Sequence, residues 1–515
     1  MRELIKFKNI YLVFIGFILL QILLMRIYPP DILEGWISDV AYHLSWEANG
    51  WMAKDIPCGA SWSTGYGKIL YVTHYLFYKI FGVGLFQARL VSFISAILIP
   101  CLLYIWTHKN ISKEIALFSA LLLTVSATFY LYAFLFYKDV LYALFVFISF
   151  SMIASGILSK KNIYFLLAGL CSGLSIDVCW RGIENVLTVY ILHCFFINRK
   201  TVFKHSLCLL LGSFIAAIYW VCVSIIPIGF SNFVEYGLGY GDHGLRFSSE
   251  IDRIVAHLFT GSLLKNLFAQ IEVIYLLVLL IIFYKYGLKN YVASKIIILW
   301  IAISFIVMSF VDDSNHPVYV LVYSPYVCIL CGIGLYELFK RNKLRAYILL
   351  IFIIFVGFVA NFGRCAKYFY HSHIKKDYDM VGYFEKLRSS VDLNKNIFGS
   401  VDNWYAFPDT QYYGGVFYLD RVIDINHELK RANEYENDYD RAKDLLNFFK
   451  NRKIVYIIAD ECVKKQLITY FPDYRMPLNN FELIDTIEDY YLGSAGIRSK
   501  HQFKTEIYKI ISYDF

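Results

Sequence analysis

The chain has 515 residues, of which 58% are hydrophobic and only 17% are charged. Soluble domains usually carry about 25% charged residues, so this composition excludes an ordinary soluble protein and favours a chain dissolved mainly in lipid. The net charge of +8 does not indicate a nucleic-acid partner, because the basic residues stand in short clusters between apolar runs.

Eleven apolar runs are predicted to cross a bilayer as helices. About 20 apolar residues cross a bilayer core, where the backbone polar groups must be satisfied within the helix. No small-residue cleavage site follows the first run, so we expect it to remain as an anchor. The predicted spans are 9–27, 86–106, 115–135, 140–158, 162–179, 184–198, 206–226, 269–285, 295–311, 318–338 and 346–362.

The orientation follows from the basic residues, because cytoplasmic loops of membrane proteins are enriched in Lys and Arg. Every second loop of this chain is basic, beginning with the segment before the first span. This alternation predicts a cytoplasmic N-terminus and, with an odd number of spans, an extracytoplasmic tail. The basic loops contain Lys109 and Lys113, Lys160 and Lys161, Arg199 to Lys204, Lys285 to Lys295, and Lys340 to Arg345.

The first extracytoplasmic loop, residues 28–85, is too long to be a simple connection. It places Asp39, Tyr42 and Glu47 just after the first span, in the segment WISDVAYHLSWEANGW. Further along, Lys68–Phe81 is apolar and aromatic but too short to span a bilayer. We therefore expect this second segment to lie along the membrane surface.

More charged residues stand at the span ends on the same predicted face. Asp139 opens the fourth span, and Arg181 lies where the fifth span meets the sixth. Each alone is also typical of a solvated helix end or an N-cap. Together they predict a functional face, since a carboxylate can act as a general base and a guanidinium can hold a phosphate. The other members of this set are Asp177, Glu184, Asp312, Asp313 and His316.

The tail, residues 363–515, has a different composition from the transmembrane region, 1–362. It alternates helix-like stretches with short strand-like runs, which is typical of a small α/β domain. The helix-like stretches are Tyr378–Ser389 and Tyr439–Asn451, and the strand-like runs are Asn396–Ser400, Lys453–Ala459 and Thr505–Ile511.

Four stretches in this order resemble the GT-C superfamily of integral-membrane glycosyltransferases. They resemble most its family 39 branch, which contains the protein O-mannosyltransferases and the lipid A aminoarabinose transferase. The stretches are WISDVAYHLSWEANGW, YGKILYVTHYLFYKIFGVGLFQARLVSFISAIL, FYKDVLYALFVF and HPVYVLVYSPYVCILCGIG. The resemblance implies a GT-C-like helical membrane domain followed by the extracytoplasmic α/β domain.

The resemblance assigns roles by position. The catalytic acid of the first loop falls on Asp39, which would act as the general base, and the second acidic position falls on Asp139. The basic position after the fifth span falls on Arg181. The tyrosine near the donor phosphate falls on Tyr319 or Tyr323.

Two departures accompany these assignments. Relatives often carry a Lys-Pro-Pro-like element in the first loop, whereas the stretch from Thr64 to Lys68 contains no proline, so Lys68 is a displaced candidate for the phosphate contact, with Arg246 as another. Val40 replaces the second residue of the family's Asp-Glu pair. We take Tyr42, Glu47 and His316 as candidates for further substrate contacts.

The implied reaction is a single inverting displacement from a polyprenyl-phosphate sugar to a hydroxyl of a glycan, lipid or protein acceptor, in a bacterial inner membrane. No cofactor and no nucleic acid are expected. A divalent metal is a lesser alternative, for which His43, Glu47, His243 and His316 are the available ligands. Two other functions stay open: another envelope enzyme, such as an O-antigen polymerase or ligase, and a transporter.

Overall fold

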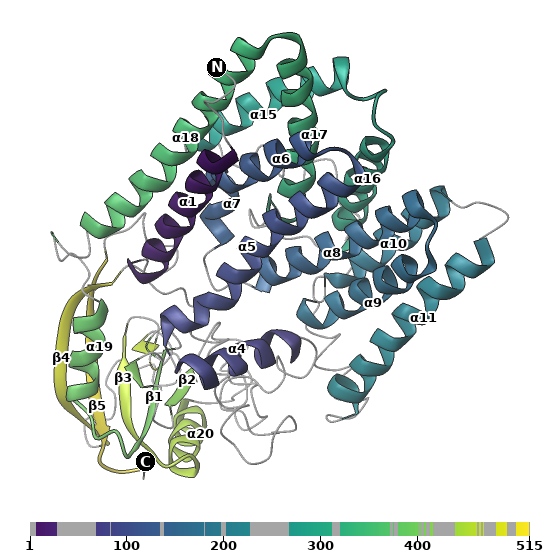
Figure 1. Cartoon of the computed structure of the whole chain (residues 1–515). Helices are drawn as coiled ribbons and strands as arrows, with labels where there is room; N and C mark the ends of the chain where they lie inside the picture. Colours follow the sequence, from purple (N-terminus) through teal and green to yellow (C-terminus); the bar gives the residue numbers. More distant parts are fainter. Residues whose placement is uncertain are drawn as a thin grey trace. The chain divides into compact units, whose positions relative to one another are not determined.

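Each predicted span coincides with helical structure in the computed structural model, and one of them, 115–135, with two helices (Figure 1). The structure describes residues 7–27, 68–82, 84–133, 138–179, 181–196, 202–226, 267–311, 320–370, 374, 380–400, 403, 406–407, 412–415, 438–460, 463–464, 467, 480–491 and 501–513. The helices over the predicted spans are α1 (Phe7–Ile27), α5 (Leu85–Asn110), α6 (Lys113–Val125), α7 (Ala127–Ala133), α8 (Lys138–Ser159), α9 (Asn162–Val178), α10 (Gly182–Phe195), α11 (Val202–Trp220), α15 (Leu267–Tyr286), α16 (Val292–Val311), α17 (Val320–Arg341) and α18 (Lys343–Phe369).

The hydropathy of these helices agrees with an integral membrane protein. Among the described residues, five helices are long and apolar enough to cross a membrane, and four shorter ones are also apolar. The five are Phe86–Asn110, Asp139–Ser159, Val202–Val223, Leu321–Arg341 and Lys343–Phe369. Within the bundle, 78% of the span in α8 is buried but only 17% of the span in α11. The apolar side chains that α11 exposes suit a surface that faces lipid.

The chain forms two compact units. Of the described residues, the first unit contains α1 as far as Arg26, the first turn of α4 (Lys68–Phe81) and residues 89–366. The second contains residues 71–88 and the part of the chain after Ala366. Residues Lys68–Phe81, which the sequence predicts to lie along the membrane surface, form helix α4.

The centre of the first unit is aromatic. Phe150 of α8 packs against Trp106 of α5, Trp300 of α16 and Tyr326 of α17, with ring centroids 4.8 to 5.3 Å apart. Trp300 and Tyr326 are fully buried. Large rings from four helices therefore fill the space between the spans.

Helices α9 and α11 approach each other so closely that only glycine fits between their backbones. A Cβ atom on Gly169 of α9 would lie 2.1 Å from the carbonyl oxygen of Leu209, and one on Gly212 of α11 would lie 2.0 Å from that of Leu166. Small residues at such contacts are the usual means of packing helices in a membrane.

The third predicted span, 115–135, is not one helix, because α6 and α7 are separated at Ser126, whose ψ of 118° is extended. Glu272 of α15 fills this junction. Its carboxylate accepts hydrogen bonds from the Ser126 hydroxyl and from both the backbone N–H and the hydroxyl of Thr128, the last two at 2.9 and 2.8 Å. The N-terminus of α7 is thereby capped by a carboxylate from another helix.

The tail contains a five-stranded sheet in the order β2-β1-β3-β5-β4. Strand β1 pairs in parallel with β2 and β3, whereas β5 pairs antiparallel with β3 and β4. The predicted strands and helices of this region are confirmed, and β2 and β4 are additional. The strands are β1 (Asn396–Ser400), β2 (Tyr412–Gly415), β3 (Ile454–Ala459), β4 (Phe481–Tyr491) and β5 (His501–Ile510), and the helices are α19 (Met380–Ser389) and α20 (Asp438–Asn451).

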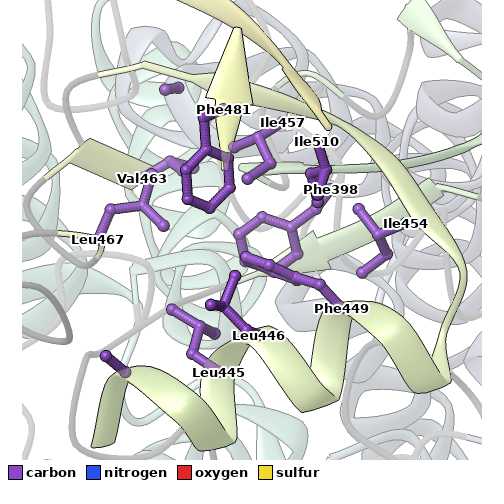
Figure 2. Close-up of a cluster of buried hydrophobic side chains, with 12 residues drawn as sticks. Phe398, Leu445, Leu446, Phe449, Ile454, Ile457, Val463, Leu467, Phe481 and Ile510 are labelled. Atoms are coloured by element: carbon purple, nitrogen blue, oxygen red, sulfur yellow. The ribbon is translucent and has the colours of Figure 1, made fainter. Parts of the chain in front are cut away.

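Two apolar cores are built on this sheet. In the first, Leu446 and Phe449 of α20 pack against Phe398, Ile457 and other strand residues (Figure 2). The second core contains Tyr383 and Leu387 of α19, together with Ile397, Ile458 and Ile507 of the strands. Ile457 and Ile458 are adjacent in β3 and point to opposite faces, as the pleat of a strand requires. One helix thus covers each face.

Candidate active site

A tight turn joins α9 to α10. The N–H of Cys179 donates to the carbonyl of Ser175 at 3.0 Å, and the N–H of Gly182 donates to the carbonyl of Cys179 at 2.7 Å. A Cβ atom on residue 182 would lie 2.2 Å from the backbone nitrogen of Ile176. The turn therefore requires glycine at position 182, and it fixes the backbone of the preceding residue, Arg181.

Arg181 and Asp139, two residues singled out from the sequence, form one ion pair. Nη1 of Arg181 lies 2.5 Å from Oδ1 of Asp139, and the side chains are only 11% and 9% exposed. Asp139 stands in the first turn of α8, where the helix dipole favours a negative charge. The sequence predicts the two residues as separate acidic and basic positions of one face, whereas the structure joins them directly.

A second layer of polar contacts lies one helical turn further along both helices. The Tyr142 hydroxyl donates to Oε2 of Glu184 at 2.7 Å and lies 3.0 Å from the carbonyl oxygen of Arg181. The hydroxyl of Thr188 donates to Oε1 of Glu184 at 3.1 Å, and that of Ser304 does so at 2.5 Å. The fully buried carboxylate of Glu184 thus fastens α8, α10 and α16 together behind the ion pair.

Tyr323, predicted to lie near the donor phosphate, belongs to the same region. It stands in α17, and its hydroxyl lies beside Ser304 and Glu184. Its ring meets that of Phe305 edge-on, with centroids 6.3 Å apart. A fourth helix therefore contributes to the layer behind the Asp139–Arg181 pair.

The N-terminus of α4 is hydrogen-bonded to the end of α9, next to the same turn. The N–H of Ile69 donates to Oδ2 of Asp177 at 2.8 Å, and Asp177 is in the last turn of α9. Lys68 is the first residue of α4. We call this whole arrangement the α8–α10 corner, with Asp139, Asp177, Arg181 and Glu184 as its charged members.

Comparison with known proteins places this corner in context. The family model for dolichyl-phosphate-mannose-protein mannosyltransferases matches residues 70–226, which include both Asp139 and Arg181. No curated protein sequence matches the chain.

The whole chain superposes on solved membrane enzymes at low sequence identity. ArnT from Cupriavidus metallidurans bound to undecaprenyl phosphate aligns with a TM-score of 0.67 and 10% identity, covering 98% of this chain and 99% of ArnT. The oligosaccharyltransferase AglB from Archaeoglobus fulgidus, in complex with an inhibitory peptide and a dolichol-phosphate, aligns with a TM-score of 0.53 and 12% identity, covering 100% of this chain and 75% of AglB. This chain has the GT-C fold.

Several predicted site residues lie outside the described residues. They are Asp39, Tyr42, Glu47, Arg246, His316 and Tyr319, together with the side chain of Lys68. In the described part of the chain, no group of three or more His, Cys, Asp or Glu residues could hold a metal ion. The candidate metal ligands His43, Glu47, His243 and His316 lie outside that part.

The hydroxyl groups that bind the Glu184 carboxylate were not predicted from the sequence. These hydroxyl groups belong to Tyr142, Thr188 and Ser304, which lie within predicted apolar spans. Tyr142 nevertheless follows Asp139 by three residues, and Glu184 follows Arg181 by three. This spacing places both pairs on matching helix faces, so the second layer of contacts could have been anticipated. Glu272 could have been noticed as a carboxylate within a span.

Proposed function

We propose that the chain is a membrane glycosyltransferase that moves a sugar from a polyprenyl-phosphate-linked donor to an acceptor hydroxyl, with inversion. The observation that carries this proposal is the buried Asp139–Arg181 pair at the α8–α10 corner. A guanidinium held in a protected site is well suited to a phosphate group. The presence of undecaprenyl phosphate and dolichol-phosphate in the GT-C structures of ArnT and AglB supports a donor of the same class.

The proposed reaction is one displacement. Asp39 takes the proton of the acceptor hydroxyl while the acceptor oxygen attacks the anomeric carbon. The bond between that carbon and the donor phosphate oxygen breaks, and the polyprenyl phosphate leaves with the electron pair. Arg181 stabilises the charge that develops on the departing phosphate, and Asp139 orients both Arg181 and the acceptor.

The proposed active face is extracytoplasmic. The alternation of basic loops supports this orientation, and cytoplasmic nucleotide sugars could not reach the site. Reporter fusions after residues 110, 160, 202, 290 and 343 should then read cytoplasmic, and fusions after 60, 250 and 400 should read external. A cytoplasmic reading after residue 400 would contradict the proposed face.

The function is tested with purified protein in lipid nanodiscs. We expect it to transfer radiolabelled sugar from at least one member of a panel of polyprenyl-phosphate pentoses and hexoses to a membrane glycolipid and glycan extract. The corresponding nucleotide sugars should give no transfer. Turnover with a nucleotide sugar in the absence of a lipid carrier would reject the proposal, and ATP- or ion-driven uptake by proteoliposomes would favour a transporter.

The base is tested by Asp39→Asn, which keeps the size and polarity of the side chain but removes its ability to accept a proton. We expect turnover to fall at least about 100-fold, the lower end of what general-base catalysis supplies. Asp31→Asn, in the same loop, is the matched control and should retain activity. If Asp39 only caps a short helix, Asn serves equally well, and the Asp39→Asn protein would then keep near-normal turnover.

A further inference from the structure

Two cations lie over one tyrosine ring where α15 and α17 end. Cζ of Arg341, in the last turn of α17, is 3.7 Å from the centre of the Tyr286 ring at the end of α15. Nζ of Lys285 is 5.3 Å from the centre of the same ring. The two helices are tightly packed, because a Cβ atom on Gly334 would lie 2.3 Å from the Leu279 carbonyl oxygen. The ring therefore stands at a fixed place in the bundle.

The nearby carboxylate is already occupied. Glu337 of α17 is 5% exposed. Its Oε1 accepts a hydrogen bond from the Tyr291 hydroxyl at 3.0 Å and lies 3.0 Å from Nζ of Lys340. Among the described residues, neither Arg341 nor Lys285 forms an ion pair with a carboxylate. The sequence around this helix end is otherwise basic, with Lys285, Lys289, Lys295, Lys340, Arg341, Lys343 and Arg345.

Two general effects explain the charge of this helix end but not its arrangement. Cations are favoured at the C-termini of helices, and basic residues are enriched at the cytoplasmic ends of membrane spans. Both effects leave the cations free to spread apart in water. Convergence on one ring brings like charges together, and like charges repel. An anion bound between the two cations removes this repulsion, so the arrangement suits an anionic ligand.

The neighbouring side chains indicate that this anion is part of a lipid. Ile281, one turn before Lys285 on the same side of α15, is 65% exposed, and Leu344, three residues after Arg341, is 62% exposed. Apolar side chains that are exposed on a membrane-spanning bundle face the acyl chains of the bilayer. A guanidinium stacked on an aromatic ring keeps its N–H donors at the edge of the ring, where two of them can bind a phosphate together.

We propose that Arg341 and Lys285, held over the Tyr286 ring, form a binding site for the phosphate of an anionic phospholipid. The acyl chains of this lipid lie against the exposed apolar side chains of α15 and of the start of α18. Basic sites between spans on the cytoplasmic side are a known means of binding anionic lipid head groups. The sequence predicts this side for the ends of α15 and α17, away from the α8–α10 corner. The inference does not depend on the proposed glycosyl transfer.

The test measures lipid binding to delipidated full-length protein in detergent by native mass spectrometry. The probes are phosphatidylglycerol and phosphatidylcholine with the same acyl chains, and we expect the wild type to prefer phosphatidylglycerol. Arg341→Gln should weaken phosphatidylglycerol binding about tenfold, as expected for the loss of one hydrogen bond to a charged group. Phosphatidylcholine binding should stay within about twofold.

The matched control is Arg345→Gln, which removes the same charge from the same exposed helix end, although the ring contact belongs to Arg341. It should stay within about twofold of the wild type. Tyr286→Leu keeps every charge but removes the ring, and it should weaken phosphatidylglycerol binding several-fold, whereas Tyr286→Phe keeps the ring and should bind like the wild type. Thermal unfolding checks that each variant is folded. If Tyr286→Leu does not fold, the comparison of Arg341→Gln with Arg345→Gln decides.

Three results would overturn the inference. A wild type that binds both lipids equally has no anionic lipid site. Equal losses in Arg341→Gln and Arg345→Gln would mean that only the overall positive charge of this helix end attracts the lipid. Displacement of phosphatidylglycerol by millimolar inorganic phosphate would assign the site to a soluble anion instead.

Discussion

The α8–α10 corner and the junction between α6 and α7 both bury a carboxylate group in the helical bundle, but they satisfy it differently. At the junction, the described partners of Glu272 are hydroxyl and backbone N–H donors of residues 126–128. At the corner, Asp139 is paired with a charged group, the guanidinium of Arg181.

This difference separates a structural role from a chemical one. The donors of the junction belong to the helix break that Glu272 caps, so the group is complete without any ligand. An ion pair can instead exchange or share its partner, because a guanidinium has five N–H donors and can bind a carboxylate and a phosphate together. We therefore expect variants at the corner to change activity and variants at the junction to change stability.

The largest effect is expected at the corner. Arg181→Met leaves the Asp139 carboxylate buried without its cation, which typically costs about 3–5 kcal/mol of stability, and it should lower sugar transfer at least about 100-fold. The measurements are thermal unfolding in detergent and transfer per folded molecule.

The double variant Asp139→Asn/Arg181→Met sharpens this comparison. With both charges removed, we expect stability to return to within about 1–2 kcal/mol of the wild type, while transfer stays low. Recovery of transfer together with stability would show that the ion pair is structural, like the junction.

The junction should respond in the opposite manner. Glu272→Leu leaves the hydroxyl and N–H donors of Ser126 and Thr128 unsatisfied, and each such group costs about 1–3 kcal/mol. We expect a loss of about 3 kcal/mol or more in the free energy of unfolding, with transfer per folded molecule within twofold. The milder Glu272→Gln keeps an acceptor; if it remained stable but lost transfer, the assignment of the junction to structure would be wrong.

A smaller effect, independent of buried charge, is expected where α9 and α11 meet. Gly169→Ala forces a Cβ atom against the Leu209 carbonyl and should cost about 1–3 kcal/mol through overpacking. Gly16→Ala is the matched control, because a Cβ atom there would meet nothing within 4 Å. If Gly169→Ala lowers transfer per folded molecule as much as Arg181→Met, then the corner is sensitive to any strain in α9, and its chemical role is less specific.

The smallest effect is expected in the tail, where a comparable carboxylate is partly exposed to water. Burial alone would raise the pKa of Glu506, but hydrogen bonds from Tyr508 and Lys464, with the charges of Lys464 and Lys504, outweigh it and lower that pKa. A carboxyl group whose pKa is lowered in the folded state stabilises the fold above its ordinary pKa, near 4.3, and the contribution is lost as the pH falls through the lowered value.

Glu506→Gln should therefore cost less than about 1 kcal/mol near neutral pH, since the group is partly screened by solvent. The difference from the wild type should shrink as the pH falls through the acidic range, as followed by thermal unfolding of the tail in the full-length protein. A difference that grew on acidification would contradict the direction of the pKa shift.

The helices of the bundle could be predicted from the sequence because a bilayer demands long apolar runs, and each predicted span coincides with helix. The break at Ser126 was not predictable, because the residue that caps it, Glu272, is distant in the sequence and contributed by another helix. Strand β4 was missed for a different reason. It is an edge strand with several acidic residues, and such charges protect exposed edges while they obscure the strand pattern.

The candidate site was predictable only as a list of charged residues at span ends. The sequence indicates that Asp139 and Arg181 lie on one face of the predicted bundle. Their pairing, however, depends on how α8 packs against the turn between α9 and α10. Asp177 shows the limit most clearly. Its position at a helix end is visible in the sequence, whereas its partner, the N–H of Ile69, is a backbone group that no residue pattern marks.

The position of β5 has a consequence for how the protein is made. Along the chain β5 comes after the other four strands, yet it lies between β3 and β4 and supplies the partner for both. The sheet cannot close before residues 501–510 have left the ribosome. Until then β3 presents an unpaired edge, and a premature stop codon before residue 501 would leave β3 with that edge exposed and β4 without the strand that it pairs with.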